Sequence, residues 1–216
     1  PMRKTIANRL TSAKRDIPHF YLRQKARVDK LLSAREVLNN ILKDKSMKIS
    51  LNDMIIKAVG QALLNNPNCN VTWGDNSILK AKVSDIAIAV AIEDGLLTPV
   101  IRNVTNKSLS SISSETKELI ERSKAKKLKP DEYSGGTMTI SNLGMMGINS
   151  FDAIINPPHG SILAIGTIET TPAFDEEDIV CKANIMNLTL SVDHRVIDGA
   201  TGAAFLNDIV SFLEEP

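Results

Sequence analysis

The chain has 216 residues, and its 26 basic and 25 acidic side chains leave a formal net charge of +1. This balance, with an aromatic content of only 4%, excludes a basic, base-stacking surface for nucleic acid. Two cysteines and three scattered histidines exclude a disulfide framework and a zinc ribbon. The longest apolar run, residues 86–92, is far shorter than the roughly 20 residues that span a bilayer. We therefore expect a globular protein that binds no metal, no nucleic acid and no membrane.

The spacing of apolar residues, together with capping and breaking residues, predicts the secondary structure in chain order. Helices are expected at residues 2–15, 29–42, 50–65, 110–128 and 199–213. Strands are expected at residues 20–28, 71–73, 78–80, 85–92, 97–101, 137–141, 161–167 and 185–192. Because helices and strands interleave, we expect an α/β fold, an α+β two-layer sandwich in which a mixed β-sheet packs against helices.

Short-range signals sharpen some of these boundaries. Asp29 and Ser50 are the expected N-caps of the second and third helices. Glycine and polar residues at 74–77 and 93–95 predict tight turns between strands. The run at residues 85–92 is too apolar for a strand with one wet face, so we expect it to be a central strand of the sheet.

The last predicted strand and the turn after it carry the strongest signal for chemistry. Read with a period of two, one face of this strand carries Met186, Leu188, Leu190, Val192 and His194. We therefore expect the imidazole of His194 to be shielded from water at a strand end, where a general base would be well placed. The alternative is a core histidine. Asp198 precedes a helix and is expected to be its N-cap, a role that can also fix the loop.

A second segment of interest ends the strand predicted at residues 137–141. Glycines at 135, 136 and 144 flank Ser141 and permit close approach of a backbone. A serine hydroxyl in this position can donate a hydrogen bond to an oxyanion, although a simple Ser/Asn turn is the alternative. The flanking residues do not form a G-x-S-x-G nucleophile elbow. His19 and His159 follow prolines and are expected in loops.

The run SVDHRVIDG at residues 191–199 resembles the H-x-x-x-D-G signature of the dihydrolipoamide acyltransferase catalytic domain of 2-oxo-acid dehydrogenase complexes. Residues 9–21, 95–100 and 155–158 also resemble that family in the same order, so the resemblance covers essentially the whole chain. The segment 136–158 looks most like the acetyl type found in pyruvate dehydrogenase complexes. The resemblance implies a chloramphenicol acetyltransferase-like fold.

The resemblance also implies a reaction and the residues that carry it. An acetyl group would move between dihydrolipoamide and coenzyme A by direct attack of a thiolate, with His194 as the general base. Ser141 would donate a hydrogen bond to the tetrahedral oxyanion, and Asp198 would hold the loop that carries His194. Further candidates for contact with substrate or coenzyme A, on weaker grounds, are Asn142, Leu97, Thr98, Arg9 and His19.

The same resemblance implies an assembly. Family members form homotrimers that build cores of about 24 or about 60 chains, with active sites at subunit interfaces. The histidine and the serine of one site then come from neighbouring subunits. The lipoyl group is carried on a separate domain, and the pyruvate dehydrogenase and dihydrolipoamide dehydrogenase components bind through other domains. We expect residues 1–216 to be the catalytic core domain alone, from a longer protein of the bacterial cytoplasm or the mitochondrial matrix.

Three alternatives remain open at the level of sequence. A succinyl or branched-chain acyltransferase of the same family would differ mainly in the volume of its acyl pocket. A scaffold core without activity would organise partner enzymes, but such relatives typically lack the histidine that is present here as His194. A serine hydrolase would form an acyl-enzyme on Ser141, which a burst of product would reveal.

Overall fold

The computed structural model describes residues 2–43, 47–74, 76–93, 95–175 and 177–216. Asp75 and Asp94, on which the two predicted turns partly fall, and Pro1 lie outside the described residues. In this part of the chain the α-helices are α1 Met2–Asp16, α2 Asp29–Ile41, α3 Leu51–Asn65, α4 Leu109–Lys124 and α5 Gly199–Glu214. The strands are β1 His19–Arg27, β2 Val71–Gly74, β3 Ser77–Lys80, β4 Ile86–Ile88, β5 Val90–Ile92, β6 Gly95–Leu97, β7 Val100–Ile101, β8 Met138–Asn142, β9 Ser161–Phe174 and β10 Val180–Asp193. Single-turn helices are η2 Val104–Asn106, η3 Pro130–Glu132 and η4 Gly144–Met146.

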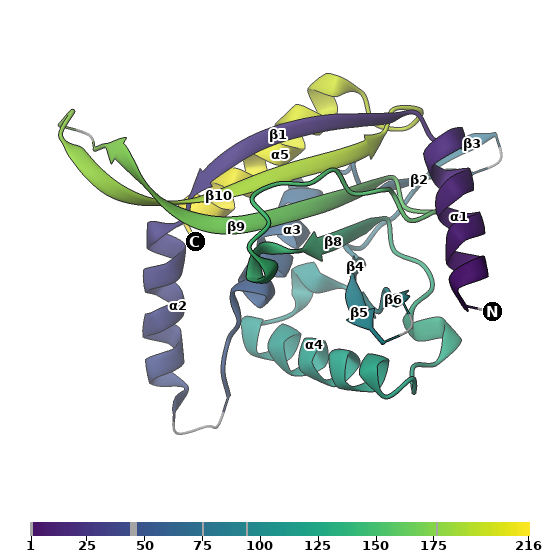
Figure 1. Cartoon of the computed structure of the whole chain (residues 1–216), viewed down its shortest axis with the longest axis horizontal. Coiled ribbons are helices and arrows are strands. Elements are labelled where there is room, and N and C mark those ends of the chain that lie inside the picture. The colour runs from purple at the N-terminus through teal and green to yellow at the C-terminus, as the bar shows by residue number, and fades with distance from the viewer. Residues whose placement is uncertain (1, 44–46, 75, 94, 176) are drawn as a thin grey trace.

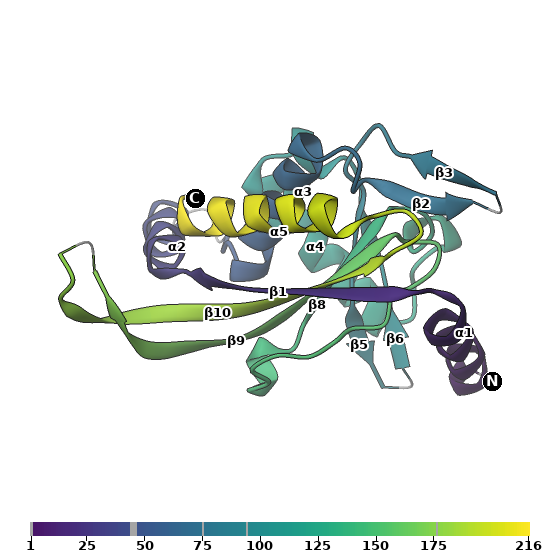
Figure 2. The ribbon, with the colours of Figure 1, turned by 90° about the horizontal axis from the view of Figure 1, so that it is seen from above.

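Six strands form one mixed sheet in the order β1-β10-β9-β8-β4-β7. The pairs β1–β10, β10–β9 and β4–β7 are antiparallel, whereas β9–β8 and β8–β4 are parallel. Helices α3 and α5 lie along one face of this sheet, as Figures 1 and 2 show. The predicted fold class, a mixed sheet packed against helices, is confirmed.

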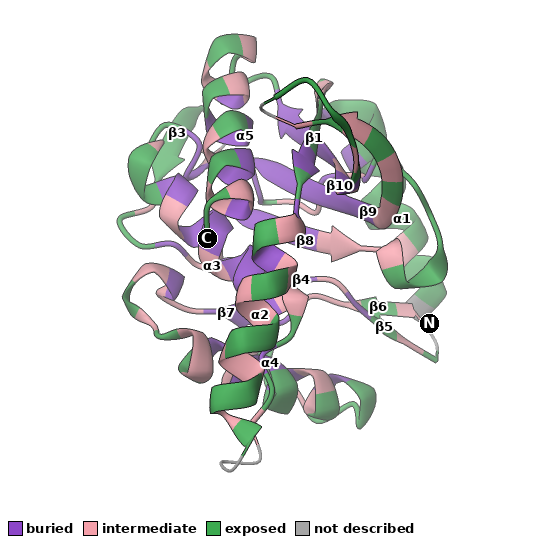
Figure 3. Cartoon of the chain, turned by 90° about the vertical axis from the view of Figure 1, so that its left-hand side faces the viewer, coloured by how far each residue is buried: buried purple, intermediate pink, exposed green. Residues whose placement is uncertain are grey.

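Two apolar cores occupy the two faces of the sheet. The larger core lies under α2, α3, α4 and α5 and includes the fully buried Phe205. The smaller core lies on the opposite face, where Ala13 of α1, Ile17 just after α1 and Ile155 pack against Ile162 and Ala164 of β9. The central strands are therefore covered on both sides, and Figure 3 shows their buried residues in the middle of the molecule.

Helix ends confirm some predicted caps and correct others. Ser50 caps α3 in a capping box, because its side chain accepts from the Asp53 N–H and the Asp53 carboxylate accepts from the Ser50 N–H. Asp29 is not an N-cap: Val28 holds that position, and the Asp29 carboxylate instead accepts a hydrogen bond from the Asn184 side chain (2.7 Å). Helix α4 ends at Lys124, four residues earlier than predicted, because Lys126 adopts φ +55°.

Strand boundaries differ from prediction where pairing partners change. The predicted strand at 85–92 is split: β4 lies between β8 and β7 in the main sheet, whereas β5 pairs with β6. Strands β9 and β10 extend past the predicted 161–167 and 185–192 to 14 residues each, and they form the long arm in Figure 1. In the outer part of β9, residues 170–174 alternate between exposed and half-buried and none is fully buried, so the sequence there shows little apolar alternation.

Candidate active site

His194 follows β10 directly and begins the turn to α5. Its backbone N–H donates to the carbonyl oxygen of Pro18 (3.0 Å), and its ring meets Phe20 edge to face at 5.1 Å between centroids. The residue is exposed in the single chain, so the expectation that it is shielded from water is wrong for one protomer. The reason is that β10 ends at Asp193, and the alternation of the strand therefore no longer sets the direction of the next side chain.

The polar face of β10, opposite the apolar one, is also buried near this end. Thr189, Ser191 and Asp193 expose 2%, 0% and 1% of their surfaces. The smaller core covers them, and the Ser191 hydroxyl donates to the carbonyl oxygen of Ala153 (2.8 Å). Both faces of the strand that leads to His194 are thus packed, which fixes the direction from which the turn departs.

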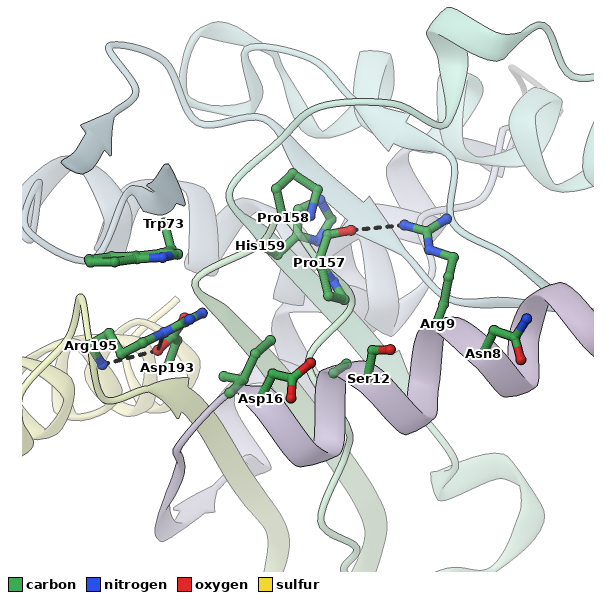
Figure 4. A pocket seen from close by; sticks show the side chains of 12 residues that line it. Asn8, Arg9, Ser12, Asp16, Trp73, Pro157, Pro158, His159, Asp193 and Arg195 are labelled. Atoms are coloured by element: carbon green, nitrogen blue, oxygen red, sulfur yellow. Dashed lines mark hydrogen bonds and ion pairs between the residues drawn. The ribbon is translucent and has the colours of Figure 1, made fainter. Parts of the chain in front are cut away.

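Asp193 and Arg195 hold the turn from both sides of His194. The buried Asp193 carboxylate accepts from Arg195 Nε (2.9 Å), Nη2 (2.7 Å) and backbone N–H (3.0 Å). This ion pair raises the pKa of the Arg195 guanidinium, which lies 5.0 Å over the ring of Trp73. Figure 4 shows this stack and the ion pair together. Sequence reasoning missed these three residues, although an Asp and an Arg on either side of a candidate base were a usable signal.

Asp198 is the N-cap of α5, as predicted. Its carboxylate accepts from the backbone N–H of Thr201 (2.8 Å), and hydrogen bonding to Thr201 lowers the pKa of this carboxyl group. The position fixes the far end of the turn that starts at Asp193. His194 is therefore carried on a short loop with both ends tied by side-chain to backbone hydrogen bonds.

Ser141 lies one residue before the end of β8 and is half-buried. No described residue forms a hydrogen bond with its hydroxyl group, so both its donor and its acceptor capacity are open. The following turn is held by the side chain of Asn142, whose Oδ1 accepts from the Gly144 N–H (2.9 Å) and whose Nδ2 donates to Asn52 (3.3 Å). A Cβ at Gly144 would lie 2.5 Å from the carbonyl oxygen of Gly166, so this close approach requires glycine.

One chain does not bring Ser141 and His194 together. In the sheet register, Ser141 lies opposite Ala164 of β9, and Ala164 lies opposite Thr189 of β10. His194 is five residues further along and two strands across, which places the two Cα atoms roughly 19 Å apart. In this conformation, one protomer therefore does not place the two side chains in a common site.

Three of the weaker candidates do come together, around a cavity of about 510 Å³ between α1, β6 and the segment 133–135. Arg9, Leu97 and Thr98 all line it. Arg9 donates to the carbonyl oxygen of Pro157 (2.9 Å), and both residues also line a second cavity of about 500 Å³ beside Trp73. Figure 4 shows this second cavity. His194, Ser141 and Asn142 line neither of the two.

The two other histidines are both held by hydrogen bonds within the chain: His159 lies in the loop before β9, as expected, whereas His19 belongs to a strand and not to a loop. His19 is the first residue of β1, and both of its ring nitrogens are engaged, with the Ile17 carbonyl oxygen and the Ile155 N–H. His159 is 4% exposed, and its ring bonds the Thr139 hydroxyl group (2.6 Å) and the Gly135 carbonyl oxygen (2.9 Å). Burial lowers the pKa of both imidazoles.

Within residues 2–43, 47–74, 76–93, 95–175 and 177–216, no group of three or more His, Cys, Asp or Glu side chains has the arrangement of a metal site. No helix in these ranges is both long and apolar enough to cross a membrane.

The fold and the H-x-x-x-D-G turn define a class of acyltransferases. The family model for the catalytic domain of 2-oxoacid dehydrogenases acyltransferase matches residues 1–216, and the chain belongs to this family. The chloramphenicol acetyltransferase structure, 13% identical, covers 95% of this chain and 94% of its own with a TM-score of 0.62, which shows the same fold.

Curated relatives match the chain at higher sequence identity. The dihydrolipoyllysine-residue acetyltransferase component of the pyruvate dehydrogenase complex of Rickettsia bellii (strain RML369-C) is 50% identical over all 216 residues. The match covers 51% of that relative, so this chain spans about half the length of the curated relatives that it matches.

Two solved structures align over 99% of this chain and 88% of their own, each with a TM-score of 0.94. One is the Azotobacter vinelandii dihydrolipoamide acetyltransferase, 30% identical, which was solved in a study of the roles of a serine, a histidine and an asparagine in its mechanism. The other is the cubic core of a pyruvate dehydrogenase multienzyme complex, 31% identical.

Proposed function

We propose that this chain is the catalytic core of a dihydrolipoyllysine-residue acetyltransferase, which moves an acetyl group between dihydrolipoamide and coenzyme A. The observation that carries the proposal is the state of His194: its backbone is fixed at both ends of a short turn, while its residue surface is exposed. The membership of the acyltransferase family and the 50% identity with the Rickettsia bellii component support the acetyl reaction.

The mechanism follows from the chemistry of thiols. A free alkyl thiol resembles cysteine, with a pKa of about 8.5, so little of it is thiolate at neutral pH. The His194 imidazole accepts the proton of the coenzyme A thiol, and the thiolate attacks the carbonyl carbon of acetyl-dihydrolipoamide. Formation of the new C–S bond gives a tetrahedral intermediate. Its oxyanion accepts a hydrogen bond from the Ser141 hydroxyl group of a neighbouring chain. The old C–S bond then breaks, and the departing dihydrolipoamide sulfur takes the proton back from His194.

Asp198 acts as a positioning residue in this scheme. Its carboxylate is committed to the N-terminus of α5 through Thr201, so it fixes the loop instead of moving protons. The asparagine studied in the Azotobacter vinelandii enzyme follows the studied histidine by four residues, the spacing between His194 and Asp198 here. An asparagine also caps helices well, so both residue types serve this role.

The separation of Ser141 from His194 supports an assembly in which subunits share active sites. We propose a homotrimer that builds a larger core, of about 24 chains if it follows the cubic arrangement of the solved relative. The other pyruvate dehydrogenase complex components would bind through domains outside residues 1–216. Homologues from bacteria and from a mitochondrial complex point to the bacterial cytoplasm or the mitochondrial matrix.

Coenzyme A and dihydrolipoamide act as substrates, and the chain offers candidate surfaces for them. The cavity lined by Arg9, Leu97 and Thr98 combines one cation with apolar side chains, a lining that suits a thioester arm. Asn142 lies next to Ser141 and orders the turn behind it. We propose these four residues as contacts of the substrate channel.

The test is an acyl-transfer assay with dihydrolipoamide and, in parallel, acetyl-, succinyl- and isobutyryl-coenzyme A. We expect the highest kcat/KM for the acetyl donor, and we expect His194→Ala to lower the rate by about 10²–10⁴-fold while the oligomer persists. A preference for another acyl group would assign the chain to another branch of the family. An inactive wild-type chain would indicate a scaffold, and a burst of acyl-enzyme a serine hydrolase.

A further inference from the structure

The junction between α1 and β1 lies directly against the turn that carries His194. In the β1–β10 register, His19 is opposite Asp193. The residue before it, Pro18, accepts the hydrogen bond of the His194 N–H (3.0 Å). The place of the His194 backbone is therefore set by where the Pro18 carbonyl points.

The ring of His19 braces this junction on two sides. Its Nδ1 lies 2.9 Å from the carbonyl oxygen of Ile17, and its Nε2 accepts from the backbone N–H of Ile155 (3.0 Å). Because a backbone N–H can only donate, Nε2 carries no proton, and Nδ1–H is the donor to Ile17. One neutral ring thus ties the residue before Pro18 to a separate loop of the smaller core. Burial lowers the pKa of His19, which favours this neutral form.

We propose that His19 is a positioning residue for His194: it fixes the Ile17–Pro18 turn, and the Pro18 carbonyl in turn holds the His194 backbone. This inference rests on the proposed acetyl-transfer function. It replaces the earlier expectation that His19 contacts coenzyme A, because both ring nitrogens are used inside the chain. The proposed role predicts an effect on the rate of the chemical step, not on the binding of coenzyme A.

Three variants of His19 separate the effects of its two hydrogen bonds. His19→Ala removes both bonds. His19→Asn places an amide N–H near the position of Nδ1 and keeps a donor for Ile17, and His19→Gln places an acceptor near the position of Nε2 for Ile155. Ser191→Ala is the matched control, because it removes a buried hydrogen bond to the same loop, at Ala153, without touching Pro18. For each variant we would measure kcat, KM for coenzyme A, the melting temperature and the oligomeric state.

We expect His19→Ala to lower kcat by on the order of 10²-fold, the loss that a misplacement of about 1 Å can cause, with KM for coenzyme A within about twofold of wild type. His19→Asn should recover most of the rate, because it restores the bond that shapes the Pro18 turn. His19→Gln should recover less. Ser191→Ala should lower the melting temperature about as much as His19→Ala and leave kcat within about threefold of wild type.

Three results would overturn the proposal. A rise in KM with unchanged kcat would make His19 a coenzyme A contact after all. An unchanged kcat and KM would make it a purely structural residue, and so would an equal loss of kcat in Ser191→Ala. If the wild-type chain shows no transfer, the proposed function fails, and crystal structures then decide the positioning role. The distance from the His194 nitrogen to the Pro18 oxygen should exceed hydrogen-bonding range in His19→Ala and stay near 3.0 Å in Ser191→Ala.

Discussion

The turn that carries His194 and the strand end that carries Ser141 are held in place in different ways. In the turn, the Asp193 carboxylate, the His194 N–H and the Asp198 carboxylate all have partners within the chain. After Ser141 the backbone is ordered by a side chain and by glycines, while Met145 is 99% exposed and the serine hydroxyl has no described partner. The turn of His194 is thus fixed within a single protomer, whereas no described residue bonds the Ser141 hydroxyl group, an arrangement that fits the proposed sharing of the site between subunits.

The strongest test of this comparison is complementation between two inactive chains. His194→Ala and Ser141→Ala should each lower kcat, by about 10²–10⁴-fold and about 10²–10³-fold. When the two are co-assembled at equal amounts, sites that take the histidine from one variant and the serine from the other are intact. We expect recovery to about a quarter of wild-type activity, measured with acetyl-coenzyme A and dihydrolipoamide.

Mixing without co-assembly is the control, because subunits that do not exchange cannot share a site. Activity that stays at the level of the single variants after verified co-assembly would mean that both side chains act within one protomer. The roughly 19 Å between them in the sheet register would then have to close by a rearrangement.

A second test weakens the turn that carries His194. Arg195→Gln leaves the buried Asp193 carboxylate without its charged partner, and we expect a loss of about 2 kcal/mol in the free energy of unfolding. Arg195→Lys should recover part of this loss, since it keeps the charge but not the two-pronged geometry. Urea unfolding measures both. Arg15→Gln, which removes an exposed ion pair with Asp16, is the control and should have no measurable effect. If Arg195→Gln and Arg15→Gln had the same free energy of unfolding, the stability of the turn would not depend on its ion pair.

The smallest expected effect is a dependence of stability on pH. Burial lowers the pKa of His19 and His159 below the ordinary 6.5, with Lys14 and Asp193 acting on the first ring in opposite directions and Arg9 on the second. The unfolded chain therefore binds more protons than the folded chain between the lowered pKa and 6.5. Stability should fall as the pH decreases through this range and should not depend on these rings above it.

Melting temperatures at about pH 7.5 and about pH 5.5 measure this dependence. His159→Gln should flatten it, because one of the two titrating rings is gone. The segment 141–150 contains no titratable side chain, so the acid sensitivity belongs to the other parts of the molecule. A melting temperature that does not change between these pH values would contradict the role given to the neutral rings.

Local signals in the sequence correctly predicted features that depend mainly on neighbouring residues. Ser50 and Asp198 cap the helices that they precede, since a cap needs only the next three residues. The spacing of apolar residues predicted helix α3 and its buried residues, and the unbroken apolar run at residues 85–92 predicted a central strand, of which only the β4 part lies in the main sheet. The family resemblance extended this to the fold class, which the sheet order and the comparisons confirm.

Features that depend on distant partners were beyond the sequence. Asp29 was predicted to cap α2, but it bonds Asn184, a partner 155 residues away. The burial of His159 depends on Thr139 and on the carbonyl oxygen of Gly135, which local patterns do not reveal. His194 was expected to be shielded because strand alternation was extended one residue past the true strand end. Burial of His194 by a neighbouring chain is a property of the assembly, and the periodicity of residues along one sequence does not report it.

The capping role of Asp198 has one further consequence. Its carboxylate serves α5 through a hydrogen bond that a neutral amide makes equally well, so helix α5 does not require a negative charge at this position. The electrostatic environment of the loop can therefore be changed without rebuilding the helix beneath it. Relatives that differ here by a single formal charge can keep the same backbone while working best at different acidities.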